Sequence, residues 1–219
     1  AEKTQGVERL YILGDFFDAW IGDDDDRPLA ETVASALQRV AARGVNIFFQ
    51  HGNRDFLLGE QYAACCGMQL LPELYAIVIN QQRVLLAHGD QFCTQDVAYQ
   101  QFRALVRNPD WQREFLAKSL VERRAIAAQL RAKSKEANSI KAEDIMDVTP
   151  AEVDAALEKY QCSVLIHGHT HRPAVHALTV GNAVQAERIV LGDWEEQYCY
   201  LQWENGAHEL RWERAPAQS

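Results

Sequence analysis

The stretch VLIHGHTH at positions 164–171 passes from three apolar residues straight into histidine and glycine. Four other short apolar runs, at 10–13, 46–50, 84–87 and 188–191, are followed in the same way by glycine and a side chain able to bind a metal. Runs of this kind are typical of strands in a sheet that is covered on both faces. In open α/β sheets, ligands bind beyond the carboxyl ends of the strands, where glycine lets the backbone turn tightly. The sequence therefore predicts an α/β fold with a functional site at the strand ends.

Helices are predicted between several of these runs. The segment 28–43 has apolar residues at helical spacing, with Pro28 suited to the first turn and Gly44 to the cap. A second helix is predicted from residue 150, because Thr149 and Glu152 stand at the spacing of a capping box.

The last part of the chain is predicted to be rich in β-structure. The runs 198–203 and 208–212 flank Asn205-Gly206, a strong signal for a tight hairpin turn. Five cysteines without any Cys-x-x-Cys pair indicate neither a disulfide framework nor a thiolate zinc site.

Charge divides the sequence into two regions. The 219 residues carry 22 Lys and Arg against 31 Asp and Glu, a formal charge of −9, which argues against non-specific nucleic-acid binding. Residues 103–141 hold ten basic and four acidic side chains, so their local charge is +6 and that of the remainder is −15. We predict a helical cap or insertion here. Its basic and apolar residues would lie on an acyl chain or an anionic bilayer, or would simply form a solvated pair of helices.

Metal-binding side chains gather at the predicted strand ends. The candidate ligands are Asp15, Asn53, His88, His169 and His171. Carboxylate, carboxamide and imidazole ligands without thiolate favour Mn²⁺, Fe²⁺ or Zn²⁺ over Ca²⁺ or Mg²⁺. An aspartate that bridges two ions fits a two-metal hydrolase. His167 is expected to support this site without binding metal, and Asp23 to Asp26 are expected to form an exposed acidic loop.

Four motifs carry a family resemblance. Gly14-Asp15, 52–55 (GNRD), 88–90 (HGD) and 168–171 (GHTH), in this order at strand ends, resemble four of the five motifs of the calcineurin-like metallophosphoesterases. The resemblance implies a four-layer α/β/β/α metallophosphoesterase sandwich. It covers residues 1–219 as a single domain, with a helical cap at about 103–141.

The resemblance also implies roles for individual residues. Asp15 would bridge two divalent ions, with Mn²⁺ expected; Asn53, His88 and His169 would complete one site, and His171 would belong to the other. Asn53 and Arg54 would be catalytic, Arg54 by contacting the pyrophosphate. The implied substrate-binding residues are Asn53, Arg54, Asp96, Ser134, Asn138, Lys141 and His169.

Longer strings narrow the resemblance within the family. These are 11–17, 19–23, 51–57, 134–138 and 169–174. They imply a dinuclear pyrophosphohydrolase that cleaves UDP-2,3-diacylglucosamine to 2,3-diacylglucosamine 1-phosphate and UMP in lipid A biosynthesis. The implied location is cytoplasmic, peripheral on the cytoplasmic face of the bacterial inner membrane. Neither a nucleic acid nor an obligate protein partner is expected.

One departure from the family pattern leaves alternatives open. The family's first motif, Asp-x-His on an N-terminal strand, has no counterpart, since no histidine precedes His51. We expect that this strand is missing from the sequence. The alternatives are a related metallophosphoesterase acting on nucleotides or phosphodiesters, and a non-catalytic lipid- or nucleotide-binding module.

Overall fold

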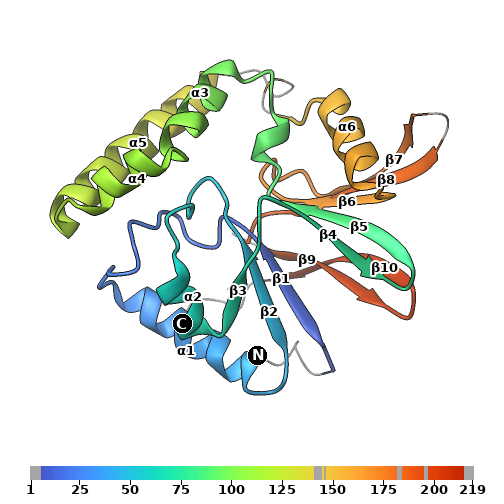
Figure 1. The fold of residues 1–219 in the computed structure, drawn as a ribbon, viewed down its shortest axis with the longest axis horizontal. Helices are drawn as coiled ribbons and strands as arrows, with labels where there is room; N and C mark the ends of the chain where they lie inside the picture. The colour runs from blue at the N-terminus through green and yellow to red at the C-terminus, as the bar shows by residue number, and fades with distance from the viewer. Residues whose placement is uncertain (1–5, 141–144, 146, 182–183, 195–196, 215–219) are drawn as a thin grey trace. The chain divides into compact units, whose positions relative to one another are not determined.

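The computed structural model describes residues 6–140, 145, 147–181, 184–194 and 197–214, and these fall into two compact units (Figure 1). The first unit comprises residues 1–72 and 97–143, and the second comprises 73–96 and 144–219. Each unit takes two separate segments of the chain. Among the described residues, no helix combines the length and the apolarity needed to cross a membrane.

The first unit contains a parallel three-stranded sheet. Its strands are β1 (Arg9–Leu13), β2 (Asn46–Gln50) and β3 (Met68–Leu70), in the order β1-β2-β3. Leu10 pairs with Ile47 and Ile47 with Met68 across the sheet. Helices α1 (Pro28–Ala41) and α2 (Glu60–Cys66) connect the strands, which confirms the helix predicted at 28–43 to within two residues at its end.

Three further helices belong to the first unit: α3 (Val97–Val106), α4 (Pro109–Leu116) and α5 (Leu120–Ile140), which follow one another in Figure 1. Residues 103–140 are therefore helical apart from two short turns. Phe115 of α4 is buried in the same apolar cluster as Phe49 of β2, and Ile126 of α5 packs against it. Burial of this kind contributes about 1.5–3 kcal/mol for each large side chain. These helices thus help to form the core of the first unit.

The acidic run 23–26 is exposed only in part, with Asp24 and Asp26 exposed and Asp25 buried. The side chain of Asp25 is fully buried and pairs with Arg27 and with Arg124 of α5. The Asp24 carboxylate pairs with Arg123 of α5, whose guanidinium also donates to the carbonyl of Ile21 over 2.7 Å. The prediction of an exposed acidic loop is therefore confirmed for Asp24 and Asp26, whereas the Asp25 side chain is buried and the loop is anchored to α5.

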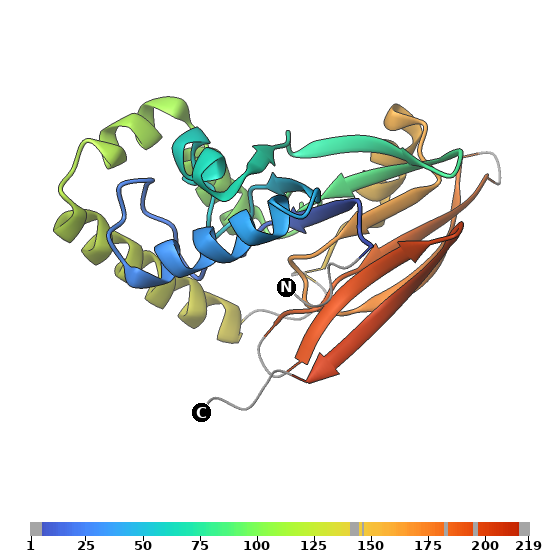
Figure 2. The same cartoon turned by 90° about the horizontal axis from the view of Figure 1, so that it is seen from below.

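The second unit contains a five-stranded mixed sheet and a hairpin (Figure 2). The sheet has the order β4-β5-β6-β8-β7, in which β5, β6 and β8 are parallel and the two outer strands are antiparallel. The strands are β4 (Leu74–Ile79), β5 (Gln82–Ala87), β6 (Val164–His167), β7 (Ala174–Val180) and β8 (Val184–Val190). The apolar runs at 84–87 and 163–166, predicted to be strands, form most of β5 and β6, which are inner strands of the sheet.

The hairpin of β9 (Gln197–Glu204) and β10 (Ala207–Arg214) turns at Asn205-Gly206, where both residues have positive φ, so that prediction is confirmed. Helix α6 (Pro150–Tyr160) begins where it was expected, but without the side-chain cap. The hydroxyl of Thr149 instead lies 2.8 Å from that of Thr94. The Thr149 hydroxyl therefore bonds to Thr94 of a neighbouring segment and does not cap α6.

Candidate functional site

Asp15 lies immediately after β1, in a conformation that the surrounding chain must impose. Its φ is 54° and that of Gly14 is 81°. A non-glycine residue in this left-handed region costs about 1–2 kcal/mol, and such residues persist where neighbouring groups hold them. The groups that hold Asp15 come from the loop after β2.

Asp55 ties the two loops of the first unit together. Its side chain is fully buried, and one carboxylate oxygen accepts the backbone N–H of Phe16 at 2.7 Å while the other accepts that of Gly52 at 2.8 Å. Hydrogen bonds to a charged acceptor contribute about 1.5–3 kcal/mol. Asp55 therefore fixes the backbone directly after Asp15 to the loop that contains Gly52.

Gly52 allows the close approach of these loops. A Cβ at this position would lie 2.3 Å from both the backbone N and Oδ1 of Asp15. Every larger residue would displace the Asp15 carboxylate, so the glycine is required by the space available.

Arg54 is bonded to the Asp15 loop through its backbone and its side chain. Its N–H donates to Asp15 Oδ1 at 2.9 Å, and its carbonyl accepts the N–H of Trp20 at 2.9 Å. Its guanidinium lies 3.4 Å from Asp15 Oδ2 and 3.1 Å from Asp18 Oδ1. The Arg54 guanidinium is planar and partly exposed, and it lies beside Asp15, a predicted metal ligand. A guanidinium in this position is suited to binding a phosphate. Asn53, directly before Arg54, lies in the same loop.

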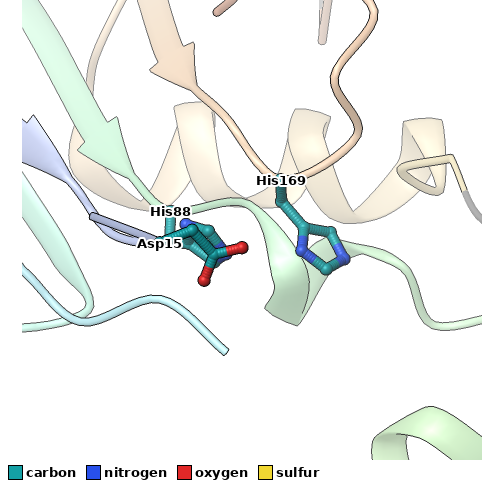
Figure 3. A group of neighbouring side chains, drawn as sticks. All are labelled: Asp15, His88 and His169. Carbon is teal, nitrogen blue, oxygen red and sulfur yellow. The ribbon is translucent and has the colours of Figure 1, made fainter. Parts of the chain in front are cut away.

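In the second unit, His88 and His169 lie at the ends of neighbouring parallel strands, β5 and β6. Their rings meet edge to face with centroids 5.1 Å apart, and His88 is buried (Figure 3). Gly168 N–H donates to the His88 carbonyl at 2.9 Å, which holds the two loops together. The third side chain labelled in Figure 3 is Asp15, which comes from the first unit.

His167 is the buried last residue of β6, and it supports the loop that carries His169. Burial lowers its pKa to about 3, so the ring is neutral at physiological pH. The ring contacts the Gly168 carbonyl at 2.9 Å, and a Cβ on Gly89 would lie 2.8 Å from its Nδ1. Packing of this kind fixes the path of the chain into His169.

His171 shares the local strain of His169. Both residues have positive φ, 54° and 63°, which turns the chain sharply between them. The His171 Nδ1 lies 3.4 Å from Asp193 Oδ2, from the segment after β8. A carboxylate behind an imidazole orients the ring for metal binding.

The side chains predicted to bind metal carry donor atoms of the kinds that divalent ions take. Asp15, His88 and His169 each offer one ligand atom, a carboxylate oxygen or an imidazole nitrogen. Asn53 adds a carboxamide. This mixed set without thiolate suits Mn²⁺, Fe²⁺ or Zn²⁺.

The remaining predicted substrate residues are distributed over both units. Asp96 is buried in the second unit, whereas Ser134 is exposed on α5 of the first unit. Asn138 lies on the last turn of α5. Lys141 is outside the described residues.

Two functional candidates were not predicted from the sequence. Asp55 stands in the GNRD motif, and Asp18 contacts both Arg54 and Arg131 of α5. The sequence places Asp55 in the GNRD motif. The N–H groups that its carboxylate accepts are set by the folded positions of two loops that are distant in sequence.

Comparison with known proteins gives matches over most of the chain. Residues 2–173 match the family model described as calcineurin-like phosphoesterase. A Cellvibrio japonicus protein named UDP-2,3-diacylglucosamine hydrolase is 56% identical over 196 residues, covering 90% of this chain and 81% of that protein. One of the same name from Escherichia coli O7:K1 is 52% identical over 197 residues, covering 90% and 82%. Among solved structures, an archaeal phosphodiesterase has a TM-score of 0.46 and 12% identity, covering 97% of this chain and 86% of that one.

Proposed function

This chain belongs to the calcineurin-like phosphoesterase family, and from that premise we propose that it hydrolyses the pyrophosphate of UDP-2,3-diacylglucosamine in lipid A biosynthesis. The products are 2,3-diacylglucosamine 1-phosphate and UMP. The observation that carries the proposal is the identity of 56% and 52% to two proteins named for this substrate, over 90% of the chain. The arrangement of Asp15 and Arg54 in one loop pair, and of His88 and His169 in another, supports it.

We propose two divalent metal ions, with Mn²⁺ as the native metal, held by Asp15, Asn53, His88, His169 and His171. When bound, such a pair activates water and neutralises phosphoryl charge. The donor chemistry supports this proposal, because it combines carboxylate, carboxamide and imidazole groups.

The chain's own residues then have distinct tasks. Arg54 binds the phosphoryl group under attack and stabilises the charge that develops on its oxygens. Asp55 and Gly52 hold Asp15 and Arg54 in their relative positions, and His167 supports the loop that carries His169. Asp96, Ser134, Asn138 and Lys141 are proposed to bind the sugar, acyl or phosphate groups of the substrate.

The test is hydrolysis of UDP-2,3-diacylglucosamine with added Mn²⁺, followed by the release of UMP. Asp15→Asn and His88→Gln are expected to lower kcat by at least about 100-fold, and EDTA to abolish turnover. His208→Gln is the matched control, since His208 pairs with Glu187 on the second unit's sheet and has no place in the proposed metal site. Its kcat is expected to stay within about twofold of the wild-type value.

The assay is run in parallel on this chain joined to the Asp-x-His strand of a relative, because no histidine precedes His51 here. Equal turnover of bis(p-nitrophenyl) phosphate and of the acylated substrate would favour a general phosphodiesterase. Tight substrate binding without turnover in both proteins would overturn the hydrolase proposal in favour of a binding module.

Peripheral contact with the cytoplasmic face of the inner membrane is proposed for helices α3 to α5. Leu105, Leu116 and Val121 are exposed on these helices, within a segment that is rich in lysine and arginine. Apolar side chains among basic ones favour an anionic bilayer surface. The protein should co-sediment with vesicles that contain about 30% phosphatidylglycerol, and Val121→Asp should lower the fraction found in the pellet. Equal retention by purely zwitterionic vesicles would contradict the proposal.

A further inference from the structure

Asp18 joins the arginine of the GNRD loop to helix α5. A single carboxylate oxygen, Oδ1, lies 3.1 Å from the Arg54 guanidinium and 3.3 Å from that of Arg131. All three residues belong to the first unit. The two guanidinium groups therefore share one acceptor oxygen.

The position of Asp18 is fixed by its backbone neighbours, although its side chain is 84% exposed. On one side, Asp55 accepts the N–H of Phe16. On the other, Trp20 donates its N–H to the carbonyl of Arg54. The loop from Asp15 to Trp20 thus wraps Arg54 and is bonded to it at both ends, which places the Asp18 carboxylate beside the guanidinium.

Charge alone gives Asp18 the wrong sign for binding a pyrophosphate. An exposed carboxylate close to the guanidinium that binds phosphate repels an anionic substrate. Removing that charge should therefore strengthen substrate binding if electrostatic repulsion is all that Asp18 contributes. A loss of activity on removing it requires another role.

We propose that Asp18 is a positioning residue that orients the Arg54 guanidinium and couples it to α5 through Arg131. Arg54 Nη1 donates a hydrogen bond to Asp18 Oδ1 at 3.1 Å, whereas Asp15 Oδ2 lies 3.4 Å from Nε, which makes no hydrogen bond within the described part of the chain. The directional hydrogen bond to Asp18 restricts rotation of the guanidinium plane more than the ion pair with Asp15 does alone. The inference rests on the proposed role of Arg54 in binding the phosphoryl group.

The first experiment measures kcat and KM for UDP-2,3-diacylglucosamine with Asp18→Asn. Misplacing a catalytic group by a fraction of an ångström lowers the rate, so we expect kcat to fall about tenfold. We expect KM to stay equal or to fall, because a repelling charge has gone. Asp18→Glu, which restores the carboxylate, should recover kcat to within about threefold of wild type.

The matched control is Asp110→Asn on α4. Asp110 is also an exposed carboxylate paired with an arginine, Arg113, in the same unit. It therefore reports what the loss of a surface ion pair does by itself. We expect unchanged kcat and KM.

A second experiment does not depend on the substrate. Phenylglyoxal modifies free guanidinium groups, and the sites are quantified by peptide mass spectrometry. In Asp18→Asn, Arg54 and Arg131 should both react several-fold faster than in the wild type, whereas Arg113 should not change. This measurement is made on the folded protein, with folding checked by circular dichroism.

The outcomes separate the two proposals. If the wild type does not hydrolyse the substrate but Arg54 and Arg131 become more reactive in Asp18→Asn, the proposed function fails while the Asp18 contacts stand. Unchanged kcat in Asp18→Asn, or unchanged reactivity of Arg54, would overturn the positioning role.

Discussion

At the scale of single residues, Asp15 depends on two neighbours that are not among its proposed fellow ligands. Gly52 makes room for its carboxylate, and Asp55 holds the backbone of both loops. The left-handed φ of Asp15 is therefore maintained by packing and hydrogen bonds from a loop 37 to 40 residues later in the sequence. Strain of this type is common where a side chain must point at a fixed target.

Gly52→Ala is expected to reduce both stability and kcat, although it adds only one methyl group. The added methyl would lie 2.3 Å from Asp15, so the carboxylate must move. We expect a loss of stability of about 1–3 kcal/mol together with a fall in kcat of at least tenfold. Urea unfolding and the hydrolysis assay measure the two effects.

The comparison variant is Gly44→Ala. Gly44 has a φ of 90° but nothing lies within 4 Å of its added Cβ. It should lose about 1–2 kcal/mol through backbone strain alone, while kcat stays unchanged. A normal kcat in Gly52→Ala would show that the Asp15 loop can adapt.

At the scale of elements, the loop after β1 anchors helix α5. Arg123 is nearly fully buried and binds both Asp24 and the Ile21 carbonyl, and Arg124 binds Asp25 and Asp26. The acidic run thus neutralises two arginines of the basic helical segment. Part of the charge separation seen in the sequence is therefore balanced locally in the fold.

Arg123→Met tests this anchor, because methionine keeps an apolar stem and removes the guanidinium. We expect a loss of about 2 kcal/mol in the free energy of unfolding at pH 7. Arg113→Met is the control, since its exposed pair with Asp110 should contribute less than about 0.5 kcal/mol.

The same pair predicts a pH dependence. The hydrogen bond from Arg123 lowers the pKa of Asp24 from its ordinary value of 3.8. A carboxyl group with a lowered pKa in the folded protein stabilises it above the unfolded pKa, and this contribution is lost as pH falls through the folded value. The difference between wild type and Arg123→Met should therefore be constant from pH 7 to about pH 5 and shrink below about pH 4. A difference that grows on acidification would contradict the pairing.

Sequence patterns predicted the elements whose burial is continuous. The runs at 46–50 and 84–87 became β2 and β5, because apolar residues on both faces leave few alternatives. Strand β3 was not predicted, since three residues carry no periodicity and only pairing with β2 defines them. Strand β7 was also missed, because Val175 is exposed and His176 is partly buried, so its apolar and polar residues do not follow the alternation of its exposure.

The candidate site was predictable to the extent that its residues follow strand ends. Asp15, His88 and His169 occupy those positions. Asp18 was not predicted, because its importance lies in contacts with Arg54 and Arg131, which are far from it in sequence. No local pattern encodes such a contact.

At the scale of the whole molecule, the proposed metal ligands come from both compact units. Asp15 and Asn53 belong to the first, and His88, His169 and His171 to the second. Each unit has its own apolar cluster, around Phe49 in one and around Leu165 in the other. Ions that the proposed ligands bind in the folded chain and not in the unfolded one should stabilise the fold.

Thermal unfolding with and without Mn²⁺ tests this expectation. At a free Mn²⁺ concentration 100 times the Kd, the wild type should gain about 2.7 kcal/mol, measured as a rise in Tm that EDTA reverses. Asp15→Asn and His88→Gln should each lose most of that gain, while His208→Gln keeps it. A full Mn²⁺-dependent shift in either ligand variant would contradict its assignment.

The interleaving of the two units has a consequence for synthesis on the ribosome. Residues 1–72 form the sheet of the first unit, but its core also needs α4 and α5, which end only after the first strands of the second unit have been made. At about 5–20 residues per second, residues 73–143 take about 4–14 s to emerge. During that interval α4 and α5 do not yet cover the aromatic side chains of the nascent sheet. The newly made chain therefore presents a transient hydrophobic surface of the kind that molecular chaperones bind.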